Sequence, residues 1–350
     1  MSHPSKLPTL DDVAAAAGVS TATVSRCLNT PEKVSEDTRS KVLQTVKKLG
    51  YTPHFGARAM AVRRTFTIGA IIPTMDNAIF ARGIQAFQEQ LHDLGYTLLV
   101  ASYAYRPDLE EEQIKALIAR GADGLLLIGY ERDPAIYADL KRRGIPALVA
   151  WAYRPAGPVP SVGFDNRAAM KTLARKVLAK GHRRIGVISG ILAGNDRAAG
   201  RLQGIREAMA EGGLDPESLT VIETPYEIEN GAEAFGRILQ NSPDCTVIMC
   251  SNDVLAVGAL QKAQALGLRV PGDISVTGFD DIELARIAQP PLTTMHVPHG
   301  EMGKNAALAL VQMIDQPDAH ADKELPVELK VRDTLGAPRR NVHLPLSPQA

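Results

Sequence analysis

The sequence lacks the features that place a protein in a membrane or outside the cell. No stretch approaches the roughly 18 to 20 continuous apolar residues of a transmembrane helix. The first residues, Met-Ser-His-Pro-Ser-Lys, contain no apolar core of a signal peptide. The three cysteines, Cys27, Cys245 and Cys250, match neither a disulfide framework nor a zinc site. We therefore expect a cytoplasmic protein with reduced thiols and no membrane partner.

Motifs for catalysis and cofactor binding are also missing. There is no P-loop, no G-x-G-x-x-G after a predicted strand and no metal-ligand spacing. Ser189-Gly190 matches only a fragment of the G-x-S-x-G motif of hydrolases. His182 falls in a predicted helix-to-strand turn without a partnered nucleophile, so a structural role is favoured. We expect no enzyme activity, no cofactor and no metal ion.

The charge of the chain is balanced overall but unevenly distributed. Residues 1–64 hold ten Lys and Arg against five Asp and Glu, so this segment carries +5 and the remaining 286 residues carry −5. A small basic segment on a larger acidic body favours a polyanion as a partner of that segment. A length of 350 residues suits two or three domains.

The basic segment predicts two short helices joined by a tight turn. Thr9, followed by acids in the first turn, is an N-cap pattern. Gly18 ends that helix, and Ser20 caps a second one two residues later. The apolar residues of the first helix recur at i, i+3, i+4 and i+7, as Leu10, Val13, Ala14 and Ala17. This arrangement is typical of a helix-turn-helix.

The second helix is predicted to have a small, polar outer face. That face consists of Thr21, Ala22, Ser25, Arg26 and Asn29. Such a face suits insertion into a DNA major groove. Ser35 is predicted to cap a third helix that ends at Gly50. A three-helix bundle with no DNA-binding role stays open as the alternative.

The segments 9–29, 34–39 and 49–53 resemble the DNA-binding head of the LacI/GalR family, with the family's spacing intact. The resemblance implies a head over residues 7–52 that binds operator DNA. The positions implied to touch base edges are Thr21, Ala22 and Arg26. The other implied DNA contacts are Thr9, Ser20, Thr23, Ser25, Asn29, Ser35 and Arg39. A bidentate contact from Arg26 to guanine is worth about 1–3 kcal/mol of discrimination.

Residues 53–64 correspond to the hinge helix of that family, which folds on operator DNA and wedges an apolar side chain into the minor groove. The implied contacts here are Ala57 and Met60, and Met60 stands where leucine is usual. Gly56 weakens an isolated helix by about 1 kcal/mol relative to alanine. A disordered basic linker is the alternative, and it is also the state that the family implies without DNA.

From residue 66 the pattern changes to apolar strands that alternate with amphipathic helices. The first series of predicted strands is Phe66–Ile72, Tyr96–Ser102, Asp123–Ile128 and Pro146–Trp151, with helices near 79–94, 108–120 and 134–143. The second series is Arg184–Ser189, Leu219–Glu223, Thr246–Cys250 and Ile274–Gly278, with helices near 167–180, 198–211, 230–240 and 253–266. Repeated βα units predict two doubly wound parallel sheets, and therefore an α/β domain of two lobes.

The predicted two-lobed domain spans residues 65–338. The first lobe comprises about 65–164 and 294–322, and the second about 165–292 and 323–338. The chain is expected to cross back to the first lobe near Thr293–Val297, to form its last helix at 300–315, and to return to the second lobe as a strand at Leu325–Val331. Residues 339–350 are predicted to be a disordered tail.

The family resemblance continues through this domain to about residue 338, and it implies a fold like that of periplasmic binding proteins. Its landmarks are 181–185, 201–204, 251–253, 278–281 and 291–294. The effector-binding positions that it implies are Arg201, Asn252 and Asp280 from the second lobe, with Pro73, Phe80 and Trp151 from the first. Core packing stays open as an alternative for both Phe80 and Trp151.

A finer resemblance, to the gluconate-responsive branch of the family, rests on Pro73-Thr74, on Asn77–Ala81, on Trp151 and on Arg197 four residues before Arg201. Two arginines in one cleft are costly without an anion to pair with them. We expect a sugar acid such as gluconate or a ketogluconate as the effector. A neutral sugar is the alternative, and a purine is less favoured.

The sequence thus predicts a ligand-responsive transcription regulator that reads a pseudo-palindromic operator as a homodimer. Whether the ligand releases DNA or promotes its binding stays open. A periplasmic sugar-binding protein and an α/β enzyme are the alternatives, and neither explains residues 9–64.

Overall fold

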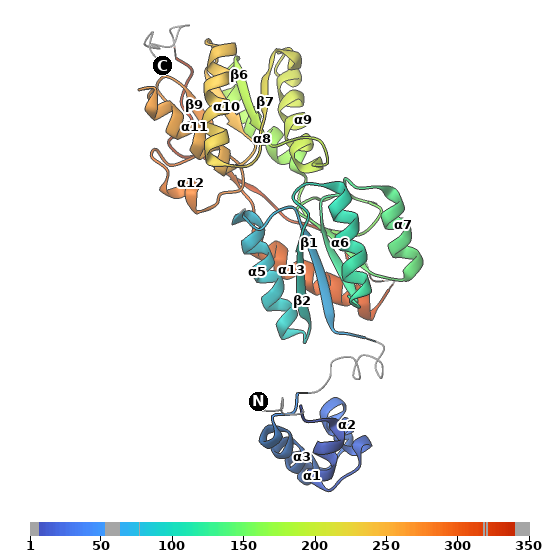
Figure 1. Cartoon of the computed structure of the whole chain (residues 1–350). Coiled ribbons are helices and arrows are strands. Elements are labelled where there is room, and N and C mark those ends of the chain that lie inside the picture. Colours follow the sequence, from blue (N-terminus) through green and yellow to red (C-terminus); the bar gives the residue numbers. More distant parts are fainter. Residues whose placement is uncertain (1–6, 53–63, 77, 318, 320, 340–350) are drawn as a thin grey trace. The chain divides into compact units, whose positions relative to one another are not determined.

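The computed structural model describes residues 7–52, 64–76, 78–317, 319 and 321–339. The chain divides into two compact units, Met1–Phe66 and Thr67–Ala350 (Figure 1). Most of the predicted hinge, including Ala57 and Met60, lies outside the described residues, and so does the predicted tail from residue 340. Arg339, which the sequence places in that tail, instead donates hydrogen bonds to the carbonyls of Cys245 and Asp273, both in the second unit.

The first unit is a three-helix bundle. Its elements are α1 (Leu10–Ala17), α2 (Thr21–Asn29), a short 3₁₀ helix (Pro31–Lys33) and α3 (Glu36–Leu49). A capping box between Thr9 and Asp12 starts α1, and Gly18 ends it with a left-handed φ of 63°. The buried core consists of Val13, Ala14, Ala17, Val24, Cys27, Val42 and Tyr51. The predicted helix-turn-helix is therefore present.

The first lobe of the second unit is built on a parallel sheet in the order β11-β5-β4-β3-β1-β2. Its strands are β1 (Thr67–Ile72), β2 (Thr97–Ser102), β3 (Gly124–Ile128), β4 (Ala147–Ala150), β5 (Ser161–Gly163) and β11 (Lys323–Glu324). Its helices are α5 (Ala78–Asp93), α6 (Pro107–Ala119), α7 (Pro134–Arg143) and α13 (His299–Asp315). Helices α5 and α13 pack together on one face of the sheet, and α6 lies on the other (Figure 1).

The second lobe is built on a parallel sheet in the order β7-β6-β8-β9. Its strands are β6 (Ile185–Ser189), β7 (Thr220–Glu223), β8 (Val247–Cys250) and β9 (Ser275–Thr277). Its helices are α8 (Asn166–Ala179), α9 (Asp196–Glu211), α10 (Ile228–Asn241), α11 (Asp253–Ala265) and the short α12 (Glu283–Ile287). The pairs α8–α9 and α10–α11 cover opposite faces of the sheet (Figure 1). Two doubly wound parallel sheets are thus confirmed.

The return of the chain to the second lobe differs from the prediction of one strand over Leu325–Val331. Lys323–Glu324 instead adds to the first lobe's sheet beside β5, and β12 (Glu328–Lys330) pairs antiparallel with β10 (Thr294–His296). Pro326 separates the two strands because proline has no N–H to donate to a ladder. The second lobe is rejoined at Thr334, whose carbonyl accepts from the Val276 N–H.

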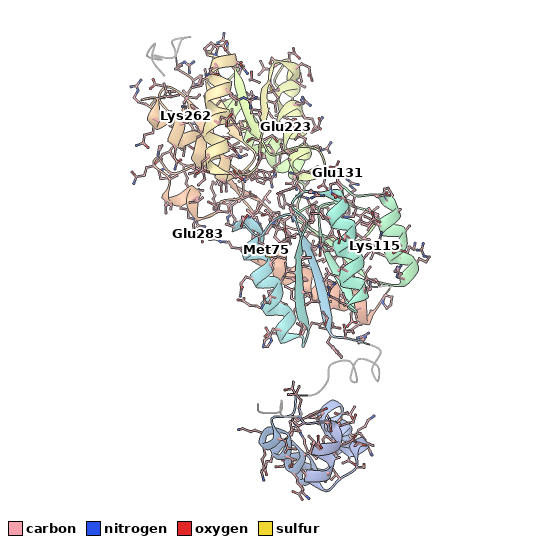
Figure 2. The ribbon with its side chains drawn as sticks, in the orientation of Figure 1. Met75, Lys115, Glu131, Glu223, Lys262 and Glu283 are labelled. Carbon is pink, nitrogen blue, oxygen red and sulfur yellow. The ribbon has the colours of Figure 1, made fainter. Side chains whose placement is uncertain are left out.

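The surface and the interior of the second unit differ as expected for a water-exposed domain. The side chains of Lys115, Glu131 and Glu223 are exposed and project from the surface (Figure 2). The residues of β1, β3 and β4 are all buried. Among the helices of the described ranges, none is long and apolar enough to cross a membrane.

Candidate functional site

The outer face of α2 presents the predicted base-contacting side chains to solvent. Ser20 caps the helix, and its Oγ accepts from the Thr23 N–H at 3.2 Å. Ala22 and Arg26 are exposed, and Thr21 is half-buried. Arg26 Nε donates to the carbonyl of Ala22 one turn earlier at 3.2 Å, which holds the guanidinium along this face. A face with one anchored arginine among small side chains fits the major groove.

The remaining head residues are arranged around this face, with one local difference from the prediction. Ser35 occupies the N-cap position of α3, but its hydroxyl donates to Thr38 Oγ1 at 2.9 Å and makes no capping bond to the helix backbone. Arg39 is exposed on α3, and Ser25 is half-buried on α2. Asn29 is the last residue of α2.

In the second unit, most of the predicted effector residues surround one small cavity. It is lined by Ile79, Phe80, Tyr105, Trp151, Asn195, Arg197, Arg201, Tyr226 and Asn252. These residues follow the carboxyl ends of strands in both lobes, where ligands bind in open α/β sheets. Its volume is about 20 Å³, which is about the room that one water molecule needs. The lobes are therefore closed around this point.

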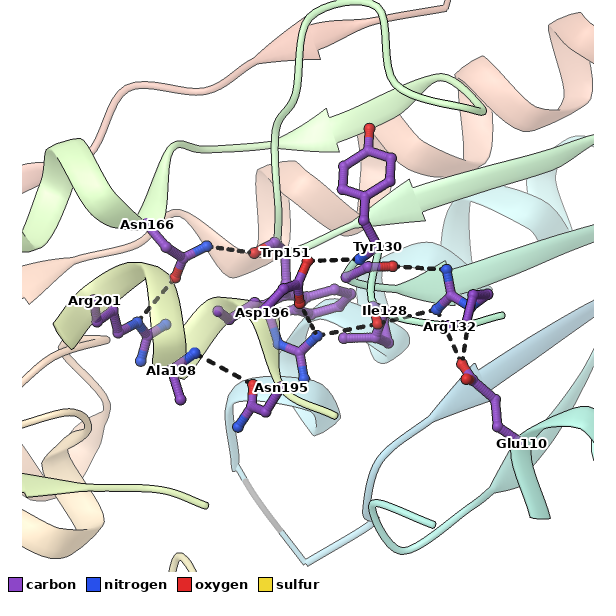
Figure 3. A network of polar contacts seen from close by, with 12 residues as sticks. Glu110, Ile128, Tyr130, Arg132, Trp151, Asn166, Asn195, Asp196, Ala198 and Arg201 are labelled. Carbon is purple, nitrogen blue, oxygen red and sulfur yellow. Dashed lines mark hydrogen bonds and ion pairs between the residues drawn. The ribbon is translucent and has the colours of Figure 1, made fainter. Parts of the chain in front are cut away.

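Arg201 is the centre of a buried polar network. Its Nε donates to Asn166 Oδ1 at 2.9 Å (Figure 3). Its Nη1 donates to the carbonyl of Ser251 at 2.5 Å. Its Nη2 lies 3.5 Å from Asp280 Oδ1, and the guanidinium stacks 3.8 Å from the centroid of the Phe279 ring. Asp280 is only 1 % exposed, and burial raises the pKa of its carboxyl while Arg201 opposes that rise. Asp280 adjoins the cavity through Arg201 although it does not line it.

Trp151 both packs in the core and lines the cavity. Its Nε1 donates to His299 Nδ1 at 3.1 Å, and its ring centroid is 5.5 Å from that of Phe80. Gly83 makes room for the indole, because a Cβ at that position would overlap it.

Burial lowers the pKa of His299 to about 3, so the ring is neutral. Since Nδ1 accepts from Trp151, the ring proton is on Nε2, which lies 3.9 Å from Asp280 Oδ1.

Arg197 approaches the cavity from the first turn of α9. Its Nη1 donates to the carbonyl of Ile128 at 3.1 Å and pairs with Asp196 Oδ1 at 3.1 Å. Each guanidinium in the cleft already faces a carboxylate, Arg197 with Asp196 and Arg201 with Asp280. The charge argument for an anionic ligand is therefore weaker than the two arginines alone suggest.

Three buried polar atoms around the cleft have no hydrogen-bond partner among the described residues. These atoms are Arg197 Nη2, Asp280 Oδ2 and His299 Nε2.

Two predicted cleft residues have other contacts. Pro73 is buried at the end of β1, where its carbonyl accepts from Ser102 Oγ at 3.2 Å, and it does not line the cavity. Asn252 lines the cavity and also caps α11, because its Oδ1 accepts from the Leu255 N–H at 2.9 Å.

Sequence reasoning missed six residues of the cleft. These are Ile79, Tyr103, Tyr105, Asn195, Tyr226 and His299. The ring of Tyr105 in the first lobe lies 6.0 Å from that of Tyr226 in the second, and burial raises the pKa of the Tyr105 phenol. Their positions directly after predicted strands are the signal that could have found them.

Comparisons with known proteins agree with both units. The model of bacterial regulatory proteins of the lacI family matches residues 9–54, and the periplasmic binding protein-like domain matches residues 174–335. The chain is 33% identical over 331 residues to the HTH-type transcriptional repressor PurR of Mannheimia succiniciproducens, covering 94% of this chain and 99% of that protein. It is 35% identical over 315 residues to the ribose operon repressor of Haemophilus influenzae, covering 89% and 93%. The chain therefore belongs to the LacI family of bacterial regulatory proteins.

A solved structure gives the same result. The lac repressor dimer bound to operator and an anti-inducer superposes with a TM-score of 0.84 at 27% identity, covering 95% of this chain and 100% of that one. The relatives named here carry no mark of a gluconate-responsive branch, so that finer resemblance is not confirmed.

Proposed function

We propose that this chain is a ligand-responsive repressor that binds a pseudo-palindromic operator as a homodimer, with one head on each half-site. The support is the intact helix-turn-helix together with the likeness to a lac repressor dimer bound to operator. A two-fold dimer places two identical recognition helices on the two halves of a palindrome. Thr21, Ala22 and Arg26 are the proposed base contacts, and the wedge by Met60 and the contact by Ala57 rest on the sequence alone.

We propose a polyhydroxylated effector for the cleft. The observation that carries this proposal is the set of three buried atoms without a partner, two donors on Arg197 and His299 and one acceptor on Asp280. A buried polar atom without a partner costs about 1–3 kcal/mol, so a ligand that supplies both donors and acceptors gains their pairing. Phe80, Trp151 and Tyr105 supply flat apolar surfaces for the carbon face of a sugar ring.

Within this class, a sugar acid such as gluconate or a ketogluconate is our first candidate, because its carboxylate can accept from Arg197 Nη2. A neutral sugar is the second candidate, favoured by the internal pairing of both guanidinium groups with Asp196 and Asp280. Both classes need the lobes to open, since the closed cavity has a volume of only about 20 Å³.

The proposed mechanism is linkage between the cleft and the heads. A ligand that prefers one arrangement of the two lobes shifts the dimer between states of different operator affinity. The response can be no larger than the difference in ligand binding free energy between those states. This mechanism holds for release and for promotion of DNA binding alike.

Thermal unfolding of the full chain with a panel of sugar acids, neutral sugars and purines tests the effector proposal. A ligand at 100 times its Kd stabilises the folded state by about 2.7 kcal/mol, so a true effector raises the Tm. A duplex recovered by binding selection then shows, by mobility shift, whether the same ligand changes DNA retention. Asp280→Asn should abolish the Tm shift and the DNA response while it retains DNA binding, because the amide keeps the shape but loses the charged acceptor.

A Tm shift by a purine alone would overturn the polyhydroxylated effector. An intact response in Asp280→Asn would mean that the cleft is wrongly assigned. Failure of the selection to recover any duplex would overturn the repressor function itself.

A further inference from the structure

A direct contact joins the two lobes beside the cavity. The N–H of Tyr130, in the loop after β3, donates to Asp196 Oδ2 at 2.6 Å, and Arg197 Nη1 donates to the carbonyl of Ile128 at 3.1 Å (Figure 3). Asp196 and Arg197, at the start of α9 in the second lobe, thus both contact the end of β3 in the first lobe. Asp196 accepts a hydrogen bond there, and Arg197 donates one. We call this set of contacts, from Asp196 and Arg197 to Ile128 and Tyr130, the clasp.

The loop side of the clasp is fixed by a buried ion pair. The side chains of Arg132 and Glu110 are 1 % and 3 % exposed, and Arg132 Nη2 lies 2.9 Å from Glu110 Oε1. Arg132 also donates to the carbonyls of Gly129 at 2.8 Å and Ile128 at 3.3 Å. The Ile128 carbonyl therefore accepts from one arginine of each lobe (Figure 3). With its carbonyls held in place, the loop presents a rigid surface to the second lobe.

The clasp leaves no room for a side chain at Gly129. This residue has φ +70°, and a Cβ there would overlap both Arg197 Nη1 and Asp196 Oδ1. Gly144, which ends α7, has a similar φ of +65°, but a Cβ there would meet nothing within 4 Å. Both glycines carry backbone strain on substitution, and of the two only Gly129 has clasp atoms in the space of a Cβ.

Arg197 also lies between two cavities. It lines the closed cavity of about 20 Å³ and a second one of about 370 Å³, which is lined as well by Tyr130, Arg154 and Asn166. The second volume lies in the range of small-molecule sites, and the first does not. Among the described residues, Arg197 alone lines both cavities.

We propose that the clasp holds the two lobes together beside the cavity of about 20 Å³ and that an effector enters this cavity only when the clasp opens. Opening separates Arg197 Nη1 from the Ile128 carbonyl and Asp196 from the Tyr130 N–H, while Arg197 Nη2 stays available to the effector. The strength of the clasp thereby sets the lobe equilibrium. Its consequence for DNA affinity rests on the proposed function, but the clasp itself does not.

The test uses the full chain without ligand or DNA, so that it is independent of the proposed effector. Gly129→Ala and Asp196→Ala each break the clasp from a different lobe, and Gly144→Ala is the matched control for backbone strain. Hydrogen exchange of the Tyr130 amide reports the clasp directly, because that N–H donates to Asp196. Emission of Trp151, the only tryptophan of the chain, reports the cavity that it lines.

We expect the Tyr130 amide to exchange about tenfold faster or more in both clasp variants, the order of effect of losing a hydrogen bond to a charged group. The Trp151 emission should move to longer wavelength in the same variants, and Gly144→Ala should behave as the native chain. Unchanged exchange in Asp196→Ala would overturn the proposal. Equal changes in Gly129→Ala and Gly144→Ala, with none in Asp196→Ala, would assign the effect to backbone strain and overturn it as well.

Discussion

The recognition face of α2 and the cleft of the second unit handle polar groups in opposite ways. On α2, Arg26 is exposed, and its guanidinium needs no carboxylate because water solvates it. In the cleft, Arg197 and Arg201 are 7 % and 5 % exposed, and each faces a carboxylate of the protein. A charge that leaves water must be paired, so the cleft is internally neutralised while the head keeps free charge for a polyanion.

This difference determines what each site can select. The head offers open donors, so its affinity for DNA carries the electrostatic and salt-dependent part expected of phosphate contacts. Among the described residues around the cleft, the buried atoms left without a partner include Arg197 Nη2, Asp280 Oδ2 and His299 Nε2. Ligand choice there depends on matching single hydrogen bonds rather than on net charge.

The largest effect that we expect from this difference is a loss of stability in the variant Arg201→Ala. Removing the guanidinium leaves the Asp280 carboxyl buried without its cation, a change that typically costs about 3–5 kcal/mol. We expect a lower free energy of unfolding for the second unit and loss of any ligand response. Denaturant unfolding of the full chain, followed by emission of Trp151, measures the change.

Arg175→Ala is the matched control for Arg201→Ala. Arg175 pairs with Glu211 at 2.7 Å, and the two side chains are 59 % and 46 % exposed. An exposed pair contributes at most about 1 kcal/mol, so this variant should unfold nearly as the native chain does. Equal destabilisation by the two variants would contradict the distinction between buried and exposed charges.

The second effect is on DNA specificity, through Arg26→Ala. Because Arg26 is exposed, we expect no change in unfolding beyond about 0.5 kcal/mol. Loss of a bidentate contact to guanine should cost about 1–3 kcal/mol of discrimination at one base pair of each half-site. Binding selection with randomised duplexes compares the native and variant preferences. An unchanged preference would remove Arg26 from base recognition.

The same contrast explains how much of each site could be predicted from the sequence. The proposed DNA contacts of the head lie on one continuous segment, so caps such as Thr9 and Ser20 and the 3.6-residue period place them on known helix faces. Cleft residues come from many separate loops. Five of the seven predicted ones line a single cavity, because strand ends could be located from apolar runs.

The pairing within the cleft could not be predicted. Nothing in the sequence indicates that Asp196 faces the Tyr130 N–H or that His299 accepts from Trp151, since these contacts join residues 66 and 148 positions apart. The strand at Lys323–Glu324 was missed for a related reason. Two residues are too few to show a period, and their place in the sheet depends on β5 beside them.

The third effect depends on pH and comes from His299. Its pKa is lowered to about 3 in the folded state, against 6.5 in the ordinary state. As pH falls below 6.5, the unfolded chain takes up a proton there that the folded chain does not. The stability that the neutral His299 ring contributes to the folded state is therefore fully present above pH 6.5. Well below pH 6.5 it is lost at about 1.4 kcal/mol per pH unit as the pH falls toward 3.

His299→Gln removes this titration and keeps an acceptor for Trp151 Nε1. The difference in unfolding free energy between the variant and the native chain should shift in the variant's favour by about 1 kcal/mol from pH 6.5 to 5.5. Contributions of the other titrating groups cancel in that difference. A pH-independent difference for His299→Gln would show that the ring is not held neutral.

The smallest effect returns to the head, where a side-chain cap at Thr9 rather than a buried charge stabilises the start of α1. Thr9 Oγ1 accepts from the Asp12 N–H at 3.3 Å and donates to Asp12 Oδ2 at 2.7 Å. Thr9→Ala removes both bonds, and losing an N-cap side chain typically costs about 1 kcal/mol. Because the cost falls on one helix terminus, hydrogen exchange of the α1 amides should become about fivefold faster, while the second unit is unaffected. Thr9→Ser should restore native exchange, since serine caps as well as threonine, whereas no rescue by serine would show that the threonine methyl, and not the cap, stabilises α1.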